Sequence, residues 1–85
     1  MRVRLPTHLR AYTKGVAEVE ASGATLAEVL ADLDQRYPGL RFRVVDEQGR
    51  IRTHIKFFVG GELVRTLAAP VGAREVQIVA ALSGG

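Results

Sequence analysis

Polar and apolar residues alternate in three stretches of the chain, which is typical of β-strands with one buried face. These stretches are Met1–Leu5, Val16–Ala21 and Glu75–Leu82. A fourth stretch, Ile55–Val59, is rich in β-branched and aromatic residues, and Gly60-Gly61 follows it as a two-residue hairpin turn into Glu62–Val64. The pattern therefore predicts five strands. We expect the first two to form a hairpin with a longer loop.

One segment between these strands has helical spacing. Its apolar residues recur every three or four positions and form a single stripe made of Leu26, Val29, Leu30, Leu33 and Tyr37. Thr25 precedes the stripe as a helix N-cap, and Glu28 three residues later completes a capping box. Pro38 disfavours helical backbone at the residue before it, so the helix is predicted to end near Tyr37.

Three connecting segments carry weaker signals. Leu40–Val45 is compatible with a short strand or an irregular connection. Asp46–Gly49 has the composition of a turn. Leu67–Gly72 is mostly apolar, and we expect a loop or a single helical turn there.

A helix that lies between two hairpins and packs on one face of their sheet gives an α+β arrangement. We expect the first and last strands to lie parallel and adjacent in the centre of a mixed sheet, which is the β-grasp (ubiquitin-like) architecture. The predicted domain spans residues 1–82. Residues 83–85 are expected to form a flexible Ser-Gly-Gly tail.

The composition fits one small folded domain. The chain has 85 residues, of which 47% are hydrophobic and 25% charged. It has no cysteine, which excludes disulfides, thiolate metal sites and a persulfide on this chain. Because the sequence shows no secretion signal and no apolar stretch that could cross a bilayer, we expect a cytoplasmic location and no membrane partner.

The formal net charge of +3 raises the question of a nucleic-acid partner. Several arginines occur at alternate positions, as in Arg2/Arg4, Arg41/Arg43 and Arg50/Arg52. Alternate residues of an extended chain lie on one side, so such pairs usually mark a solvated strand face. No aromatic residues interleave with them as they do in grooves for single-stranded nucleic acid. Nucleic acid is therefore not the expected partner.

Catalysis by side chains finds little support in the sequence. His8 and His54 are far apart and have no second ligand at helical spacing, so we expect both at the surface without a metal. Asp32 and Asp34 are two residues apart on the predicted helix and do not face each other. Ser83 lacks the glycine setting of a nucleophile elbow. No permanently bound cofactor is expected.

The end of the chain is a better candidate. There a predicted strand gives way to Gly84-Gly85 and a free carboxylate. On its own, such an ending is also compatible with a frayed terminus. Two residues without Cβ form a thin, conformationally permissive thread that can enter a narrow channel of a partner. After activation, for instance as an acyl-adenylate, the carboxylate of Gly85 can be attacked by a sulfur nucleophile to give a thiocarboxylate.

The sequence resembles the ubiquitin-like sulfur carriers, which include the small subunit of molybdopterin synthase, the thiamine-pathway carrier and the cysteine-biosynthesis carrier. The resemblance covers essentially the whole chain. It rests on the opening strand, Gly23-Ala24-Thr25-Leu26, Ile55–Val59 and the closing Val76–Gly85 with its Ser83-Gly84-Gly85 end. The cysteine-biosynthesis type is the most similar, through Leu5-Pro6-Thr7, Leu9-Arg10 and Ala21-Ser22-Gly23. Many relatives have an Asn where this chain has Gly60-Gly61, and prolines where it has Ala80-Ala81-Leu82.

The resemblance implies a carrier rather than an enzyme. The implied activator is an E1-like adenylyltransferase or sulfurtransferase that consumes ATP at Gly85, and Gly84 belongs to the tail that it acts on. The implied acceptor is a cysteine synthase-like enzyme or the large subunit of molybdopterin synthase. Two alternatives stay open at this point: a protein modifier joined through Gly85 to lysines, and a basic RNA-binding β-grasp module for which Gly85 is dispensable.

One face of the predicted sheet is a candidate docking surface. If Ile55, Phe57 and Val59 point toward the helix, then Phe58, Val79 and Ala81 lie on the opposite face. An exposed apolar cluster of this kind marks a contact site. The alternative is that Phe58 packs under a loop. Leu82 and Ser83, next to the terminal glycines, complete the expected partner-binding set.

Overall fold

The structure, a computed structural model, describes residues 1–80. Its elements in chain order are β1 (Arg2–Arg4), the 3₁₀ helix η1 (Thr7–Thr13), β2 (Glu18–Glu20), α1 (Leu26–Arg36), α2 (Leu40–Val44), β3 (Ile55–Val59), β4 (Glu62–Val64) and β5 (Val76–Ala80). The predicted continuation of the last strand to Leu82 and the predicted tail of residues 83–85 lie outside the described residues. The domain boundary at residue 82 stays a prediction.

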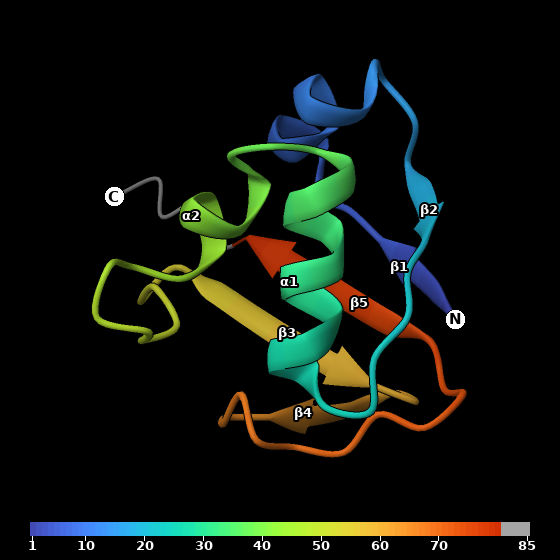
Figure 1. Ribbon diagram of the computed structural model, residues 1–85, viewed down its shortest axis with the longest axis vertical. Helices are drawn as coiled ribbons and strands as arrows, with labels where there is room; N and C mark the ends of the chain where they lie inside the picture. The colour runs from blue at the N-terminus through green and yellow to red at the C-terminus, as the bar shows by residue number, and fades with distance from the viewer. Residues whose placement is uncertain (81–85) are drawn as a thin grey trace.

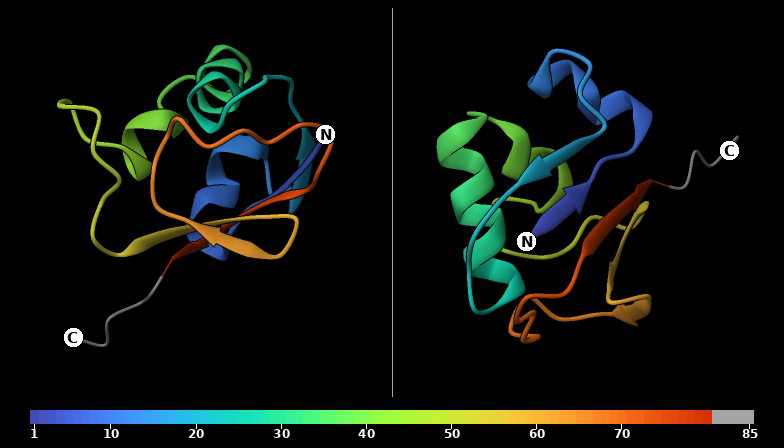
Figure 2. Two further views of the ribbon diagram at one scale, coloured as in Figure 1. Left: turned by 90° about the horizontal axis from the view of Figure 1, so that it is seen from below. Right: turned by 90° about the vertical axis from the view of Figure 1, so that its right-hand side faces the viewer.

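The five strands form one mixed sheet in the order β2-β1-β5-β3-β4. β1 runs parallel to β5, with Val3 opposite Val76, and the other neighbouring strands are antiparallel. α1 crosses one face of this sheet, so the molecule has a helical layer and a sheet layer (Figures 1 and 2). The predicted β-grasp architecture, with the first and last strands parallel and adjacent, is confirmed.

α1 begins and ends where its flanking residues predict. The Thr25 hydroxyl accepts a hydrogen bond from the Glu28 N–H at 3.3 Å, and the Glu28 carboxylate accepts one from the Ala24 N–H at 3.0 Å. The return bond thus reaches one residue before the N-cap and not the N-cap itself. At the other end the Tyr37 N–H donates to the Leu33 carbonyl, and the helix stops before Pro38.

The segment between β4 and β5 is a loop that closes the start of α1. The N–H groups of Leu26 and Ala27 donate to the carbonyls of Ala69 and Leu67, at 3.0 and 2.9 Å. The first N–H groups of a helix have no partner within the helix, so these carbonyls satisfy donors that α1 cannot satisfy alone. For residues 67–72 we expected either a loop or a single helical turn, and the structure has a loop.

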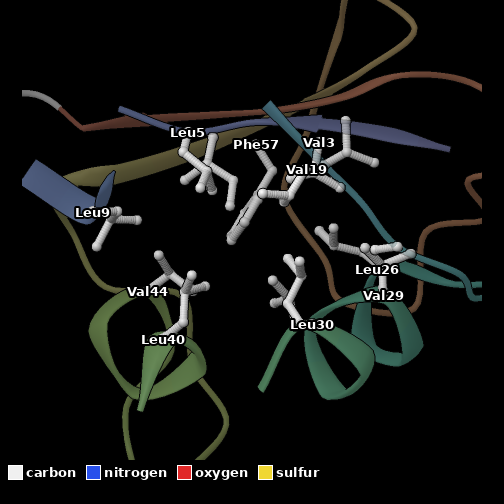
Figure 3. Packing of buried hydrophobic residues seen from close by; sticks show 14 of the residues in the cluster. Val3, Leu5, Leu9, Val19, Leu26, Val29, Leu30, Leu40, Val44 and Phe57 are labelled. Atoms are coloured by element: carbon white, nitrogen blue, oxygen red, sulfur yellow. The ribbon is translucent and has the colours of Figure 1, made fainter. Parts of the chain in front are cut away.

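The core lies between α1 and the inner face of the sheet (Figure 3). The predicted apolar stripe of α1 is fully buried at Leu26, Val29, Leu30 and Leu33. Tyr37, at the end of this stripe, is only partly buried. The sheet contributes inward-facing residues from its central strands, namely Val3, Ile55, Phe57, Val59, Val76 and Ile78. The predicted inward orientation of Ile55, Phe57 and Val59 is therefore confirmed.

Residues 40–45 form neither the strand nor the irregular connection expected, because α2 occupies Leu40–Val44. Leu40, Phe42 and Val44 alternate with arginines and so mimic a strand, but Leu40 and Val44 are also one helical turn apart. Both are buried, while Phe42 is 52% exposed. The Asp34 carboxylate accepts hydrogen bonds from the N–H groups of Gly39 and Arg41, which holds the start of this short helix.

The connection between β1 and β2 is more ordered than the predicted loop. It forms η1, whose Leu9 is fully buried and whose Thr13 hydroxyl donates to the Val16 carbonyl at 2.7 Å. β2 spans Glu18–Glu20 and is therefore shorter than the predicted strand at residues 16–21. Val16 lies outside it and is 49% exposed. A single buried leucine in a polar segment explains why the alternation of residues gave no sign of η1.

Both predicted turns are confirmed. Gly60 and Gly61 have φ of 58° and 86°, as a two-residue hairpin turn with positive φ at both positions requires. In the turn after α2, the Asp46 carboxylate accepts hydrogen bonds from the N–H groups of Arg50 and Gln48, both at 2.9 Å. The bond from Arg50 is the largest cause that lowers the pKa of Asp46, since it stabilises the charged form.

Replacing Leu30 with alanine should lower the free energy of unfolding by about 2–5 kcal/mol, because a fully buried side chain is removed and a cavity remains. Urea unfolding followed by circular dichroism measures the change. Gln35→Ala, at an exposed position of the same helix, is the control and should change it by no more than about 0.5 kcal/mol. Equal effects of the two substitutions would contradict the packing described.

Gly23→Ala should also destabilise the fold, by about 1–3 kcal/mol, which is typical of overpacking. A Cβ at this position would lie 2.6 Å from the Val29 nitrogen and 2.8 Å from the Glu28 carbonyl carbon, and both are backbone atoms of the first turn of α1. Thermal unfolding tests this expectation. The neighbouring exposed Ser22→Ala is the control, and a melting temperature of Gly23→Ala equal to that of this control refutes the expectation.

Candidate functional site

The last described strand ends in the middle of the sheet. β5 pairs with β3 over its whole length, from Val59↔Val76 to Ile55↔Ala80. Its pairing with β1 stops at Arg4↔Gln77, because β1 ends there and Pro6 leads into η1. The final residues of β5 therefore have a paired neighbour on one side only.

The open side of β5 faces a groove of about 430 Å³, here called the strand-end groove. Its walls are the end of β1 with the start of η1, and the residues of β5 from Gln77 to Ala80. His8 and Arg10 give the groove a basic rim, and the Arg10 guanidinium donates to the Leu5 carbonyl at 3.2 Å. The groove thus lies beside the point at which the chain leaves the sheet.

The sequence-predicted chemical site lies beyond this point. Gly84 and Gly85, together with Ala81, Leu82 and Ser83 of the expected partner-binding set, are outside the described residues. The last described residue, Ala80, lies opposite Ile55. Five residues of fully extended chain span at most about 18 Å, so an enzyme that acts on Gly85 must approach the end of β5 to within that distance.

The outer face of the sheet carries an apolar cluster formed by Phe58, Leu63 and Val79. Phe58 of β3 lies directly opposite Leu63 of β4. Val79 of β5 is the diagonal neighbour of Phe58 on the other side of β3. Leu63 is 39% exposed, whereas Phe58 and Val79 are half-buried. The predicted position of Phe58 and Val79 on this face is correct, while their part in binding a partner stays a prediction. Leu63 was missed because the register of β4 was not known.

The fold brings the two histidines to one surface pocket although they are far apart in sequence. We call this the basic pocket and define it by its lining residues, His8, Phe42, Arg43, Arg52 and His54. Its volume is about 260 Å³. Both histidines are exposed, as predicted. The pocket itself could not be predicted from the sequence, because its residues come from η1, α2 and the segment before β3.

Arg52 organises one wall of the basic pocket. Its guanidinium carbon lies 4.9 Å from the centre of the Phe42 ring, and its Nε donates to the Phe42 carbonyl at 2.9 Å. A cation over an aromatic ring is attracted by the negative face of the ring. These two contacts fix the exposed end of α2 against the segment that leads into β3.

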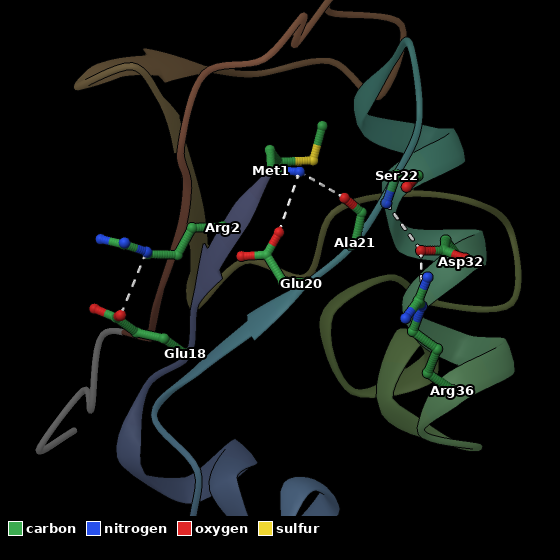
Figure 4. A network of polar contacts seen from close by, with 8 residues as sticks. All are labelled: Met1, Arg2, Glu18, Glu20, Ala21, Ser22, Asp32 and Arg36. Atoms are coloured by element: carbon green, nitrogen blue, oxygen red, sulfur yellow. Dashed lines mark hydrogen bonds and ion pairs between the residues drawn. The ribbon is translucent and has the colours of Figure 1, made fainter.

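The arginines of β1 are balanced by carboxylates, and Figure 4 shows the ion pair of Arg2 with Glu18. Arg2 and Arg4 lie 3.5 and 3.4 Å from the Glu18 carboxylate on β2, and Arg2 also lies 3.9 Å from Glu75. The amino group of Met1 donates to the Ala21 carbonyl at 2.8 Å, and Glu20 is 3.7 Å away. This side of the sheet therefore does not form a continuous positive track of the kind that nucleic acid requires.

Two properties of residues 1–80 bear on the class of site. No three His, Asp or Glu side chains in this part of the chain are placed to hold a metal ion. None of its helices has the length and apolar character needed to cross a membrane.

The ThiS family model matches residues 3–85. The sulfur carrier protein CysO of Mycobacterium tuberculosis is 35% identical over 89 aligned positions, which cover 98% of this chain and 96% of that protein. Among solved structures, the fold is similar to a chain of the BexX/CysO complex of Amycolatopsis orientalis, with a TM-score of 0.91, 36% identity and coverage of 99% of this chain and 98% of that one.

A second kind of relative also has this fold. The small archaeal modifier protein SAMP1 of Haloferax volcanii matches with a TM-score of 0.78 and 27% identity, over 100% of this chain and 98% of that one. The family match spans almost the whole sequence, and the resemblance to sulfur carriers deduced from the sequence is confirmed. The chain therefore belongs to the ThiS family of ubiquitin-like sulfur carriers.

Proposed function

We propose that this chain carries sulfur as a thiocarboxylate on Gly85. The observation that carries the proposal is the family match, which extends through residue 85 and so includes the terminal Gly84-Gly85 pair. The similarity to CysO, a sulfur carrier, supports the same function. The fold adds a physical reason, because β5 lies between β1 and β3 and fixes the position of Ala80, from which the chain continues toward Gly85.

The chemistry takes place in two displacement steps. The Gly85 carboxylate attacks the α-phosphate of ATP, pyrophosphate leaves, and an acyl-adenylate forms. Hydrosulfide from the sulfur donor then attacks the carbonyl carbon of the acyl-adenylate, the bond to AMP breaks, and the acyl group becomes a thiocarboxylate as AMP leaves. The first step is necessary because a carboxylate is a poor electrophile at neutral pH. ATP is consumed by the partner, and the carrier contributes its terminus.

Two partner enzymes follow from this chemistry. An E1-like adenylyltransferase or sulfurtransferase activates and charges Gly85, and an acceptor enzyme takes the sulfur. We favour a cysteine synthase-like acceptor over the molybdopterin synthase large subunit, because the CysO similarity extends over nearly the whole chain. The BexX/CysO complex supports a carrier of this shape that assembles with a partner.

The outer apolar cluster is the docking surface that we propose for these enzymes. It lies on the same strands that position the end of the chain, since Val79 belongs to β5 and Phe58 to its neighbour β3. Contact there would align the partner with Gly84 and Gly85, and in this proposal Ala81, Leu82 and Ser83 would continue the binding surface toward them. Exposed apolar clusters of this kind are typical of contact sites.

Protein modification is a second candidate function, and one observation favours it. The fold matches SAMP1, a small archaeal modifier protein, over the whole chain. The same acyl-adenylate at Gly85 could be attacked by a lysine amine of another protein, which would give an amide in place of a thiocarboxylate. The two functions thus differ only in the nucleophile.

Incubation with ATP, an E1-like activator and a sulfur donor should raise the intact mass of the chain by the difference between one sulfur and one oxygen atom. Mass spectrometry of the whole chain measures this, and fragmentation should place the change on Gly85. The reaction without ATP is the control. A chain that lacks Gly84 and Gly85 should stay uncharged, and charging of this truncated chain would falsify the proposal.

Modification of other proteins predicts a different outcome. Cell lysate probed for the chain should then contain higher-mass conjugates that vanish when Gly85 is deleted. If the chain only carries sulfur, lysate that contains a functional activator should show the free chain and no higher-mass conjugates. Observation of conjugates through lysine amides in the intact chain would establish the second function beside or in place of the first.

A further inference from the structure

The basic pocket contains four basic side chains and no carboxylate among its lining residues. Its composition therefore differs from that of β1, where Glu18 lies close to both arginines. Within residues 1–80, neither Arg43 nor Arg52 forms an ion pair. Positive charge at this pocket is thus available to a partner.

The carboxylate that follows α2, Asp46, offsets only part of this charge. It is held by the backbone N–H groups of Gln48 and Arg50, and the charges of Arg50 and Arg52 contribute to its lowered pKa. Arg52 is in addition directed toward the carbonyl and ring of Phe42. Arg43 is exposed, and no hydrogen bond of its side chain is found within the described part of the chain.

The pocket lies at the base of the tail. His54 directly precedes Ile55, which pairs with Ala80, the last described residue. His8 lines both the basic pocket and the strand-end groove, which also includes Ala80. Because Gly85 is within about 18 Å of Ala80 along the chain, an enzyme that binds Gly85 comes close to this pocket.

We propose that the basic pocket binds an acidic segment, a run of Asp or Glu side chains, on the enzyme that takes up the tail. The inference rests on the proposed function, which requires such an enzyme. Carboxylates are the matching partners because guanidinium groups bind them through paired, charge-assisted hydrogen bonds. Two arginines and two histidines that converge on one small pocket offer several such donors.

A protein segment fits these observations better than RNA does. Phenylalanine, tyrosine and tryptophan rings are the usual stacking platforms for bases, and the one such ring among the lining residues, Phe42, already holds the Arg52 guanidinium over its face. The positive charge is also local, because the arginines of β1 are balanced by Glu18 and Glu75. The experiment must therefore distinguish binding of an acidic protein segment from binding of RNA.

The first experiment uses an end-capped hexaglutamate peptide as the probe and the full isotope-labelled chain. NMR shift changes on titration should be concentrated at the residues of the basic pocket. Arg43→Glu should weaken binding by about fivefold or more, since one exposed ion pair is replaced by a repulsion. Lys14→Glu makes the same change of charge at an exposed residue at the end of η1 and should weaken binding less than Arg43→Glu does.

Three results would overturn the inference. They are shift changes that map away from the pocket, equal weakening by Arg43→Glu and Lys14→Glu, and tighter binding of a uridine hexanucleotide than of hexaglutamate at the same pocket. The last of these results would assign the pocket to RNA. Thermal unfolding of both variants, with midpoints equal to that of the unaltered chain, shows that the comparison concerns binding.

The second experiment separates this inference from the proposed function. With an E1-like activator, Arg43→Glu should raise the KM for the chain by about fivefold, while Lys14→Glu keeps the original KM. If Arg43→Glu is charged normally with an unchanged KM, the proposed role of the basic pocket is wrong, while sulfur carriage is unaffected. Failure of the unaltered chain to become charged, with hexaglutamate still bound at the pocket, overturns sulfur carriage instead.

Discussion

The parallel pairing of β1 with β5 is the constraint on which the rest of the structure depends. Parallel neighbours cannot be joined by a tight turn, so the chain must cross a face of the sheet before it returns, and α1 lies in that crossover. β5 then takes the central position between β1 and β3, with Val76 and Ile78 buried beneath α1. As a result, β5 pairs with β3 along its whole length and with β1 at its first two residues, and its remaining residues border the strand-end groove.

The elements whose local and long-range signals agree could be predicted from the sequence. α1 has an apolar stripe, a capping threonine and a terminating proline that all indicate the same boundaries, and the structure has them. Residues 40–44 carry two conflicting signals, since their apolar residues fit a period of two as well as one helical turn. Contact with α1 and η1, which no local pattern reveals, decides for the helix. The 3₁₀ helix η1 depends in the same way on one buried leucine.

In the candidate site, too, some features follow from a local sequence pattern and others depend on long-range packing. The outer-face position of Phe58 and Val79 follows from the alternation of a strand, so it could be deduced once the inner residues were known. The basic pocket could not, because its members come from three segments whose relative placement is set by packing. Interpreted along the chain alone, His8 and His54 are isolated surface residues. The fold makes them neighbours at the base of the segment that carries Gly84-Gly85.

The central position of β5 has a consequence for biosynthesis. A ribosome makes this strand after every other strand of the sheet. Until β5 has been made, β1 and β3 have no common neighbour, and the core lacks Val76 and Ile78. The loop carbonyls that complete the start of α1 are also late in the sequence. The sheet therefore cannot be completed before residues 76–80 have been made, so the stable domain and the strand that leads toward Gly84-Gly85 form together.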